Sequence, residues 1–364
     1  MTIAAQASRM RFHVDGWDPT YGSSVENAEY NIADSTAKVT PHIELAPADW
    51  KPISPSQVSA PGAVLFVDGV RRVEARIWIE QPPSGFVDGV RRVEARIWIE
   101  QPPSAEPATS TGNTVRDAQM ALCASYAAGT VCCCPDRGAH LLTIDYQRGL
   151  FTTATNAADV PTTAGTYKAT ITPDDQDQNL AVLLSTALQR QLTELEVLVA
   201  THARTALTGH GVPDGSDLLV VDGPLRGRTH LPRALGFIKS HRTAYLPPDL
   251  HAMIATLAPG ERSPVFLMGT SWDRHAWYLR LPCTPGAPWA GIVRLECAAD
   301  IPAAAAIELA NLSQALLPRY ASIEYKDTRA PQNLVPVAGL ERELRRHLGN
   351  PILLSRALRV ASAS

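Results

Sequence analysis

The sequence has no long apolar segment and no excess of charge of one sign. None of its 364 residues belong to an apolar run of the roughly 18 residues that a membrane span needs, and its first residues lack a basic segment followed by an apolar stretch. Lysine and arginine total 33 against 36 for aspartate and glutamate, which gives a net charge of −3. We therefore expect no membrane contact and a cytoplasmic location, and we expect any binding to nucleic acid to use a local basic patch.

The cysteines and glycines lack the spacing of two common kinds of site. None of the six cysteines forms a Cys-x-x-Cys pair with a second ligand pair at zinc spacing. The run Cys132-Cys133-Cys134 continues an apolar segment, so we expect a strand of small hydrophobic side chains there rather than a metal site. Neither Gly-x-x-x-x-Gly-Lys nor Gly-x-Gly-x-x-Gly occurs, which argues against an ATP-binding relative with an actin-like or sugar-kinase core.

The first part of the chain predicts an irregular arm followed by strands. Residues 1–60 are rich in Pro, Ser, Asp and Gly without sustained periodicity, so we expect an irregular N-terminal arm. The apolar run 63–68 and the alternating run 72–80 together predict a hairpin. Residues 120–134 predict a further strand pair broken near Ala128-Gly129, and residues 161–178 are polar and typical of a loop.

The second part predicts helices between strands. Leucines at three- and four-residue steps predict a helix over residues 179–207. Further strands are expected at 217–222, 234–239, 265–268, 276–281 and 291–296, and helices at 303–317 and within 337–359. Strand hairpins followed by alternating helices and strands predict an α/β fold, with a mixed sheet flanked by helices.

A segment of the first strand region is duplicated without change. Residues 66–84 recur as residues 86–104, with only Gly85 between the copies. Two identical copies argue against a solenoid, which needs at least three repeats. The first copy follows an apolar lead-in that extends a buried strand, whereas the second follows two prolines, which cannot donate hydrogen bonds to a sheet. We therefore favour Asp68 of the first copy over Asp88 of the second as the acid at the end of a strand.

Two acidic residues follow apolar strands and are each followed by glycine. These pairs are Asp68-Gly69 and Asp222-Gly223, and ligands of open α/β sheets bind at the carboxyl ends of the strands. A single such pair would indicate only a turn. The intervening helix adds Glu196 on or beside its buried stripe, whereas Glu194 points elsewhere. Three such carboxylates can hold Mn²⁺ or Mg²⁺, which prefer oxygen ligands, and paired cations about 3.5–4 Å apart promote attack on a phosphodiester.

Basic residues close to the second acid predict phosphate contacts. Lys239 ends an apolar strand beside the proposed acids, where a cation neutralises charge that develops on phosphate. We expect Arg280 to steady the phosphate together with this lysine. The candidate DNA-binding residues are Arg226, Arg228, Arg233, Lys239, Arg242 and Arg280. The alternative interpretation of the run from Arg226 to Arg233 is a solvated basic face.

Several of these segments resemble motifs of the NurA nuclease family, in the same order over roughly residues 60–350. They are Val64-Leu-Phe-Val-Asp68-Gly, Leu219-Val-Val-Asp222-Gly-Pro-Leu225, Gly236-Phe-Ile-Lys239-Ser and Trp277-Tyr-Leu-Arg280-Leu. The resemblance implies an RNase H-like nuclease domain over residues 61–350, followed by a tail of residues 351–364. It further implies a homodimer, Mn²⁺- or Mg²⁺-dependent DNA cleavage, and partnership with a HerA-type hexameric ATPase in DNA-end processing or repair. Within it, Asp68 and Asp222 are metal ligands, and Glu196 is the helical acid.

The C-terminal part departs from the family pattern. The family places a tyrosine and, eight residues later, a histidine near the site, where this chain has Asn333 and Glu341. Glu341 is a further candidate metal ligand, or alternatively an exposed acid of a helix turn, and Asn333 is a poorer ligand. Two hypotheses follow. The chain is either a metal-dependent deoxyribonuclease with Asp68, Glu196, Asp222 and Lys239 as catalytic residues, or an inactive subunit of the same fold that guides DNA for the ATPase.

Overall fold

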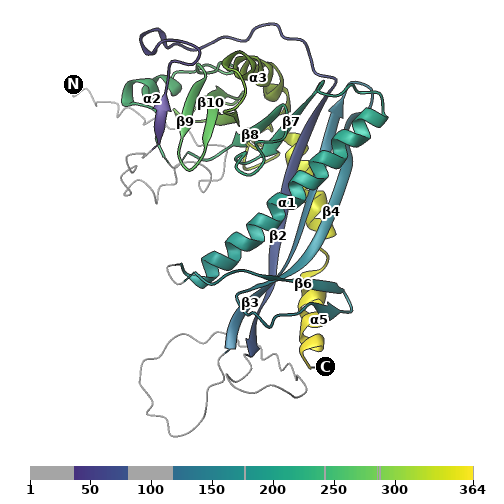
Figure 1. Cartoon of the computed structure of the whole chain (residues 1–364). Helices are drawn as coiled ribbons and strands as arrows, with labels where there is room; N and C mark the ends of the chain where they lie inside the picture. The colour runs from purple at the N-terminus through teal and green to yellow at the C-terminus, as the bar shows by residue number, and fades with distance from the viewer. Residues whose placement is uncertain are drawn as a thin grey trace, which may run out of the picture. The chain divides into compact units, whose positions relative to one another are not determined.

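The protein has an α/β fold built on a mixed sheet flanked by helices, as predicted (Figure 1). The computed structural model describes residues 37–80, 118–175, 178–241, 243–284, 286 and 288–363. Within these residues, eleven strands are hydrogen-bonded in the order β1-β9-β10-β11-β8-β7-β2-β3-β4-β6-β5. The chain divides into two compact units.

The first unit contains the described residues up to Phe66, together with Val131–His140 and Leu207–Gly339. Its strands are β1 (Lys38–Thr40), β7 (Asp217–Asp222), β8 (Ala234–Ile238), β9 (Phe266–Gly269), β10 (Asp273–Arg280) and β11 (Ile292–Ala298). Its helices are η2 (Pro47–Asp49), α2 (Pro248–Ile254), α3 (Ala303–Leu316) and η3 (Leu317–Tyr320). Strands β7 and β8 are parallel, whereas the pairs β8–β11, β11–β10, β10–β9 and β9–β1 are antiparallel.

The core of the first unit explains why β7 reads as an unbroken apolar run. Its residues Leu218 and Val220 join a buried cluster with Trp277 of β10 and Leu309 of α3. The strand is buried over all but its last residue, which is the usual state of a parallel strand covered on both faces. Helix α3 ends just before Pro318, which cannot continue an α-helix.

The second unit contains the described residues of Val67–Thr130, Leu141–Ala206 and the chain from Leu340 onwards. The elements lying wholly or partly in it are β2 (Ala63–Glu80), β3 (Ala118–Cys134), β4 (Gly138–Thr152), β5 (Val160–Thr162), β6 (Gly165–Ile171), α1 (Leu180–Gly209), α4 (Val335–His347) and α5 (Pro351–Ala363). Helix α1 runs along the long strands (Figure 1). It buries the predicted stripe of Leu184, Leu188, Leu192, Leu195 and Val199.

Three expectations for this region were wrong. The predicted hairpin over residues 63–80 is the single strand β2, and the strand pair predicted to break near Ala128-Gly129 is the single strand β3. A Cβ atom at Gly69 would lie 2.7 Å from Leu192, and one at Gly129 would lie 2.9 Å from the Thr143 carbonyl oxygen. These glycines therefore permit close packing rather than turns. The loop expected over residues 161–178 contains β6 and most of β5.

Other expectations concern the chain ends and the duplicated segment. The predicted N-terminal arm contributes β1 and η2 to the described residues, and its residues 1–36 lie outside them. The first copy of the duplication provides most of β2, and the second copy, with Asp88, lies outside the described residues. Helix α4 ends before the predicted break at residues 349–351, and α5 begins at its last residue, Pro351, so that the predicted tail is largely helical.

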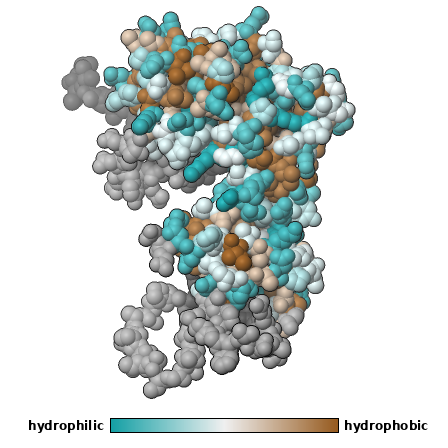
Figure 2. Space-filling view, viewed as in Figure 1, coloured by the Kyte–Doolittle hydropathy of each residue, from teal (hydrophilic) through white to brown (hydrophobic). Residues whose placement is uncertain are grey.

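The surface carries both hydrophilic and apolar side chains. Figure 2 shows hydrophilic residues spread over the visible face of each unit, with apolar residues between them. Within the described part of the chain, none of the helices combines the length and the apolar character that crossing a bilayer requires.

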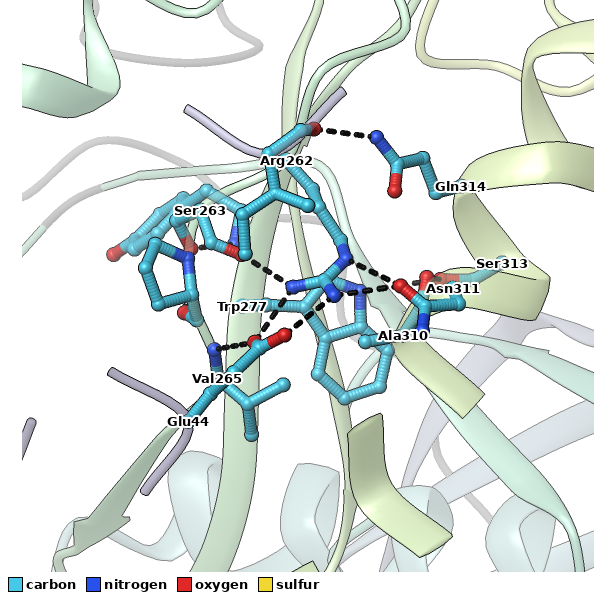
Figure 3. A network of polar contacts seen from close by, with 12 residues as sticks. Glu44, Arg262, Ser263, Val265, Trp277, Ala310, Asn311, Ser313 and Gln314 are labelled. Atoms are coloured by element: carbon cyan, nitrogen blue, oxygen red, sulfur yellow. Dashed lines mark hydrogen bonds and ion pairs between the residues drawn. The ribbon is translucent and has the colours of Figure 1, made fainter. Parts of the chain in front are cut away.

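A buried ion pair joins distant segments of the first unit (Figure 3). The Arg262 guanidinium donates to both carboxylate oxygens of Glu44 over 2.7 Å and to Oδ1 of Asn311 on α3. Glu44 Oε2 also accepts from the Val265 backbone N–H. Because Arg262 is only 1% exposed, its charge depends on this bidentate partner.

We expect Glu44→Ala to lower the free energy of unfolding by about 3–5 kcal/mol, because it leaves the buried Arg262 charge without its carboxylate. Urea unfolding followed by circular dichroism measures the change. The control is Glu343→Ala, which removes an exposed ion pair with Arg346 and should cost at most about 1 kcal/mol. Equal losses for the two variants would contradict the role given to the buried pair.

Candidate functional site

The first candidate site lies at the carboxyl edge of the parallel pair β7 and β8. Asp222 ends β7 and pairs in register with Phe237 of β8, so that Lys239 follows at the same edge. Lys239 Nζ donates to Asp222 Oδ2 over 2.7 Å. The lysine side chain is 8% exposed and the aspartate side chain 19%. The structure thus places Lys239 beside Asp222, as the sequence predicted.

Two further polar residues extend this pair. Lys239 Nζ also donates to Asn333 Oδ1 over 3.1 Å, and Asn333 Nδ2 donates to Asp327 Oδ2 over 2.7 Å. The other oxygen of Asp327 accepts the backbone N–H of Arg329. The result is a continuous chain of hydrogen bonds from Asp222 to Asp327. Asn333, expected only as a poor ligand, instead orients the lysine.

A buried carboxylate accepts a hydrogen bond from the loop that follows Asp222. Gly223 has φ 114°, a conformation that favours glycine, and lets the chain turn directly after the strand. The Leu225 backbone N–H then donates to Glu296 Oε1 over 2.8 Å. Burial raises the pKa of Glu296, while the nearby Arg294, the Leu225 N–H and Arg274 act in the opposite direction. Glu296 is therefore a positioning residue for this loop.

Two more of the predicted acids, Asp68 of β2 and Glu196 of α1, lie in the second unit. The Gly69 backbone N–H donates to Asp68 Oδ1 over 2.7 Å. Glu196 is 4% exposed, and its Oε1 lies 2.5 Å from where a Cβ atom at Gly69 would be. The glycine beside Asp68 thus makes room for the carboxylate of Glu196. Glu194, by contrast, is exposed and accepts a hydrogen bond from Gln191. This confirms the prediction that Glu196 lies on the buried side of the helix and that Glu194 points elsewhere.

The remaining candidate metal ligand is already paired. Glu341 lies on α4 in the second unit, where its Oε1 accepts from Arg345 over 2.6 Å one helical turn away. The intrahelical contact agrees with the alternative interpretation of Glu341 as an acid of a helix turn, but its side chain is 15% exposed and so is half-buried rather than exposed.

Most of the predicted DNA-binding arginines donate hydrogen bonds to backbone carbonyl oxygens of the protein itself. Arg228 donates to the Pro224 carbonyl oxygen, and Arg233 donates to that of Asp217. Arg280 donates to three carbonyl oxygens, those of Ala255, Pro288 and Ala290. Arg228 and Arg280 are also buried, so these two do not present their guanidinium groups to phosphate, contrary to expectation.

Few cations of the predicted basic run therefore remain at the surface. Arg226 is exposed, whereas Arg242 lies outside the described residues. Burial lowers the pKa of His241 to about 4, so its imidazole is neutral at pH 7. Its Nε2 contacts the Ile292 carbonyl oxygen over 3.0 Å, and a neutral ring with its hydrogen on Nε2 donates there. Of the chain's described part, Arg226 is the predicted DNA-binding arginine that the surroundings leave most exposed.

Sequence reasoning found Asp222 and Lys239 but missed the residues that hold them. Asp327 lies in a turn without any strand or helix pattern, and Glu296 lies inside a strand, where a buried carboxylate has no periodic signal. The only available signal was Gly236 in the segment before Lys239. A Cβ atom there would lie 2.8 Å from Glu296 Cγ and 2.9 Å from the Gly223 carbonyl oxygen.

Comparison with known proteins does not assign this site. No family model matches the chain, and no curated protein matches its sequence. The functional assignment therefore depends on the residues described above and on the resemblance of four short motifs.

We expect Gly236→Ala to lower the free energy of unfolding by about 1–3 kcal/mol, because the new methyl group would meet backbone atoms that cannot rotate away. The substitution should also displace the loop after Asp222. Thermal and urea unfolding measure the first effect. The control is Gly339→Ala on α4, where a Cβ atom meets nothing within 4 Å and alanine should be neutral or stabilising. An unchanged stability for Gly236→Ala would show that the loop is not packed as described.

Proposed function

We propose that this protein is a metal-dependent deoxyribonuclease of the NurA type, acting in DNA-end processing or repair. The contact between Lys239 Nζ and Asp222 Oδ2 at the carboxyl edge of β7 and β8 is the observation that carries the proposal. In open α/β sheets this edge is where ligands bind. An acid and a lysine held there on rigid strands supply the two charges that phosphodiester hydrolysis needs, one for a cation and one for the phosphate.

The chemistry of Asp222 suits a divalent cation. Its Oδ2 accepts from Lys239, and within the described residues its Oδ1 makes no hydrogen bond. The side chain is 19% exposed, so a solvated cation has access to it. Mg²⁺ and Mn²⁺ favour carboxylate oxygens and retain several waters. Asp222 is thus proposed as the metal ligand of the first unit.

Asp68 and Glu196 are the proposed ligands of the second unit. Glu196 is buried beside Gly69, and the backbone N–H of that glycine fixes one oxygen of Asp68. Both side chains offer oxygen atoms. Successive side chains of a strand point to opposite faces, so Asp68 lies on the other face of β2 from the one at which Gly69 meets Glu196, and each carboxylate is proposed as a ligand by itself. A divalent cation, when bound, withdraws charge from the phosphate and promotes attack by water.

The lysine has a proposed role of its own in the reaction. Lys239 Nζ is fixed by two acceptors, Asp222 Oδ2 and Asn333 Oδ1. An ammonium group held in this way needs little reorganisation to neutralise the charge that develops on a scissile phosphate. The further family features, a homodimer and a HerA-type hexameric ATPase as partner, belong to the same proposal.

A second candidate function is a catalytically inactive subunit that guides DNA for the ATPase. The observation that favours it is the same ion pair, because Lys239 already neutralises Asp222 in the place where a cation would do so. Arg228 and Arg280 also donate to backbone carbonyl oxygens, so they do not make the phosphate contacts that a nuclease would need from them. The two functions differ in whether phosphodiester bonds are cleaved.

We expect Asp222→Asn to reduce Mn²⁺- or Mg²⁺-dependent cleavage by about 100-fold or more, equivalent to about 3 kcal/mol of transition-state stabilisation. The assay uses end-labelled single- and double-stranded DNA, with and without the ATPase. Asp214→Asn is the control, because Asp214 lies in an exposed turn and accepts only from Thr208 in the same segment. Equal cleavage by wild type and Asp222→Asn would exclude Asp222 as a ligand. Absence of cleavage by the wild type with the ATPase present would favour the inactive subunit.

We expect Glu196→Gln to reduce cleavage by a similar factor while keeping the shape of the side chain. The matched control is Glu194→Gln on the same helix, since Glu194 is exposed and points away. Isothermal titration with Mn²⁺ should show weaker binding for Glu196→Gln and unchanged binding for Glu194→Gln. Identical behaviour of the two variants in both assays would remove Glu196 from the site.

A further inference from the structure

Three side chains with soft or borderline metal-ligand atoms meet where β3 turns into β4. Cys132 and Cys134 lie at the end of β3, and His140 lies near the start of β4. One ligand atom from each of these residues lies within 4.8 Å of the other two. All three belong to the segment Val131–His140 of the first unit, so the cluster is formed by a single hairpin.

The strand geometry explains why two of the three consecutive cysteines take part. Side chains alternate between the faces of a strand, so Cys132 and Cys134 share one face and Cys133 points to the other. Cys133 packs against the buried core of the first unit. It also shares a hydrogen bond with Tyr320. The middle cysteine therefore belongs to the core, and the outer two face the histidine.

The histidine is held in a form that suits metal binding. Its Nδ1 lies 3.1 Å from the carbonyl oxygen of Gly138, an acceptor to which Nδ1 can only donate. A neutral imidazole that donates through Nδ1 keeps a lone pair on Nε2. Such a contact between a ligating histidine and a backbone carbonyl is the usual second contact in metal sites. Gly138 has φ 63°, so the turn that supplies this carbonyl has a conformation that favours glycine.

We propose that Cys132, Cys134 and His140 form a zinc site that is separate from the proposed nuclease centre. Two thiolates and an imidazole favour Zn²⁺ over Mg²⁺ or Mn²⁺, which prefer oxygen ligands. Three protein ligands leave the fourth position of a tetrahedral zinc ion for a molecule from solution. The site ties the ends of two long strands together across their turn. Zinc binding there releases protons from the thiols, because the ligating form of cysteine is the thiolate.

Cobalt provides the direct test, because thiolate ligands give Co²⁺ an intense charge-transfer absorption that oxygen ligands do not. The full-length protein is reduced, freed of metal with a chelator and titrated with Co²⁺. We expect the absorption to saturate at one Co²⁺ per chain and to disappear when Zn²⁺ is added. Cys132→Ser and Cys134→Ser should each lose most of the absorption. His140→Asn should weaken binding by about tenfold or more.

Cys133→Ser is the matched control, since its side chain points away from the cluster, and it should keep the cobalt absorption. Asp222→Asn should keep it as well, which separates this site from the proposed nuclease centre. Failure of the nuclease proposal therefore leaves this result unaffected. No charge-transfer absorption in the reduced wild type, or an equal loss in Cys133→Ser and Cys132→Ser, would overturn the zinc site.

Alkylation of the wild type provides a measurement that does not depend on the folding of any variant. Cys134 and Cys283 are both partly exposed thiols. Zinc should slow the reaction of Cys134 with iodoacetamide by about tenfold or more and leave Cys283 unchanged, as peptide mass spectrometry would show. Equal protection of the two cysteines, or protection of neither, would contradict the proposal.

Discussion

The parallel pairing of β7 with β8 is the constraint on which the proposed site of the first unit depends. Parallel strands bring their carboxyl ends to one edge, so a residue that ends β7 and a residue that follows β8 become neighbours despite lying 17 positions apart. The pairing is possible because both strands are apolar and buried. The polar residues at their ends are then forced to satisfy one another, and Asp222 and Lys239 do so at 2.7 Å. The fold therefore explains why Asp222 and Lys239 are close. An ion pair between them fits an active nuclease, and it also fits an inactive subunit in which the lysine neutralises an acid that binds no cation.

The first unit presents fewer arginines at its surface than the sequence predicted, because several of them donate hydrogen bonds to backbone carbonyl oxygens. A sequence shows that arginines are clustered, but it does not show which backbone carbonyl oxygens lack partners once loops fold. Arg280 is the extreme case, because its guanidinium donates to carbonyl oxygens of three residues in two loops. Such a side chain organises loops and excludes water from them, which a surface cation does not. Lysine has no planar fork, and the Lys239 ammonium group makes one contact with Asp222 and one with Asn333.

Much of the fold could be predicted from local pattern, and the errors have a common physical origin. The buried stripe of α1 and the strand β7 follow directly from leucine periodicity and an apolar run. The continuity of β2 and β3 could not be predicted, because Gly69 and Gly129 are turn formers in isolation and become packing residues only when a helix lies against them. For the same reason the neighbourhood of Lys239 was predictable from strand order, whereas Asp327 and Glu296 were not. Their positions depend on contacts between segments that no short pattern encodes.

The three consecutive cysteines at the end of β3 have different surroundings, because side chains alternate between the two faces of a strand. Cys133 packs, partly buried, against the core, as the apolar run predicted, and burial raises its pKa to about 11. Its neighbours face His140 on the other side. A purely hydrophobic role explains the middle thiol but gives no reason for an imidazole to approach the outer two. The ligand atoms also separate the two proposed metal sites by chemistry, since sulfur and nitrogen favour zinc while the carboxylates favour Mg²⁺ or Mn²⁺. The two proposals therefore require different cations.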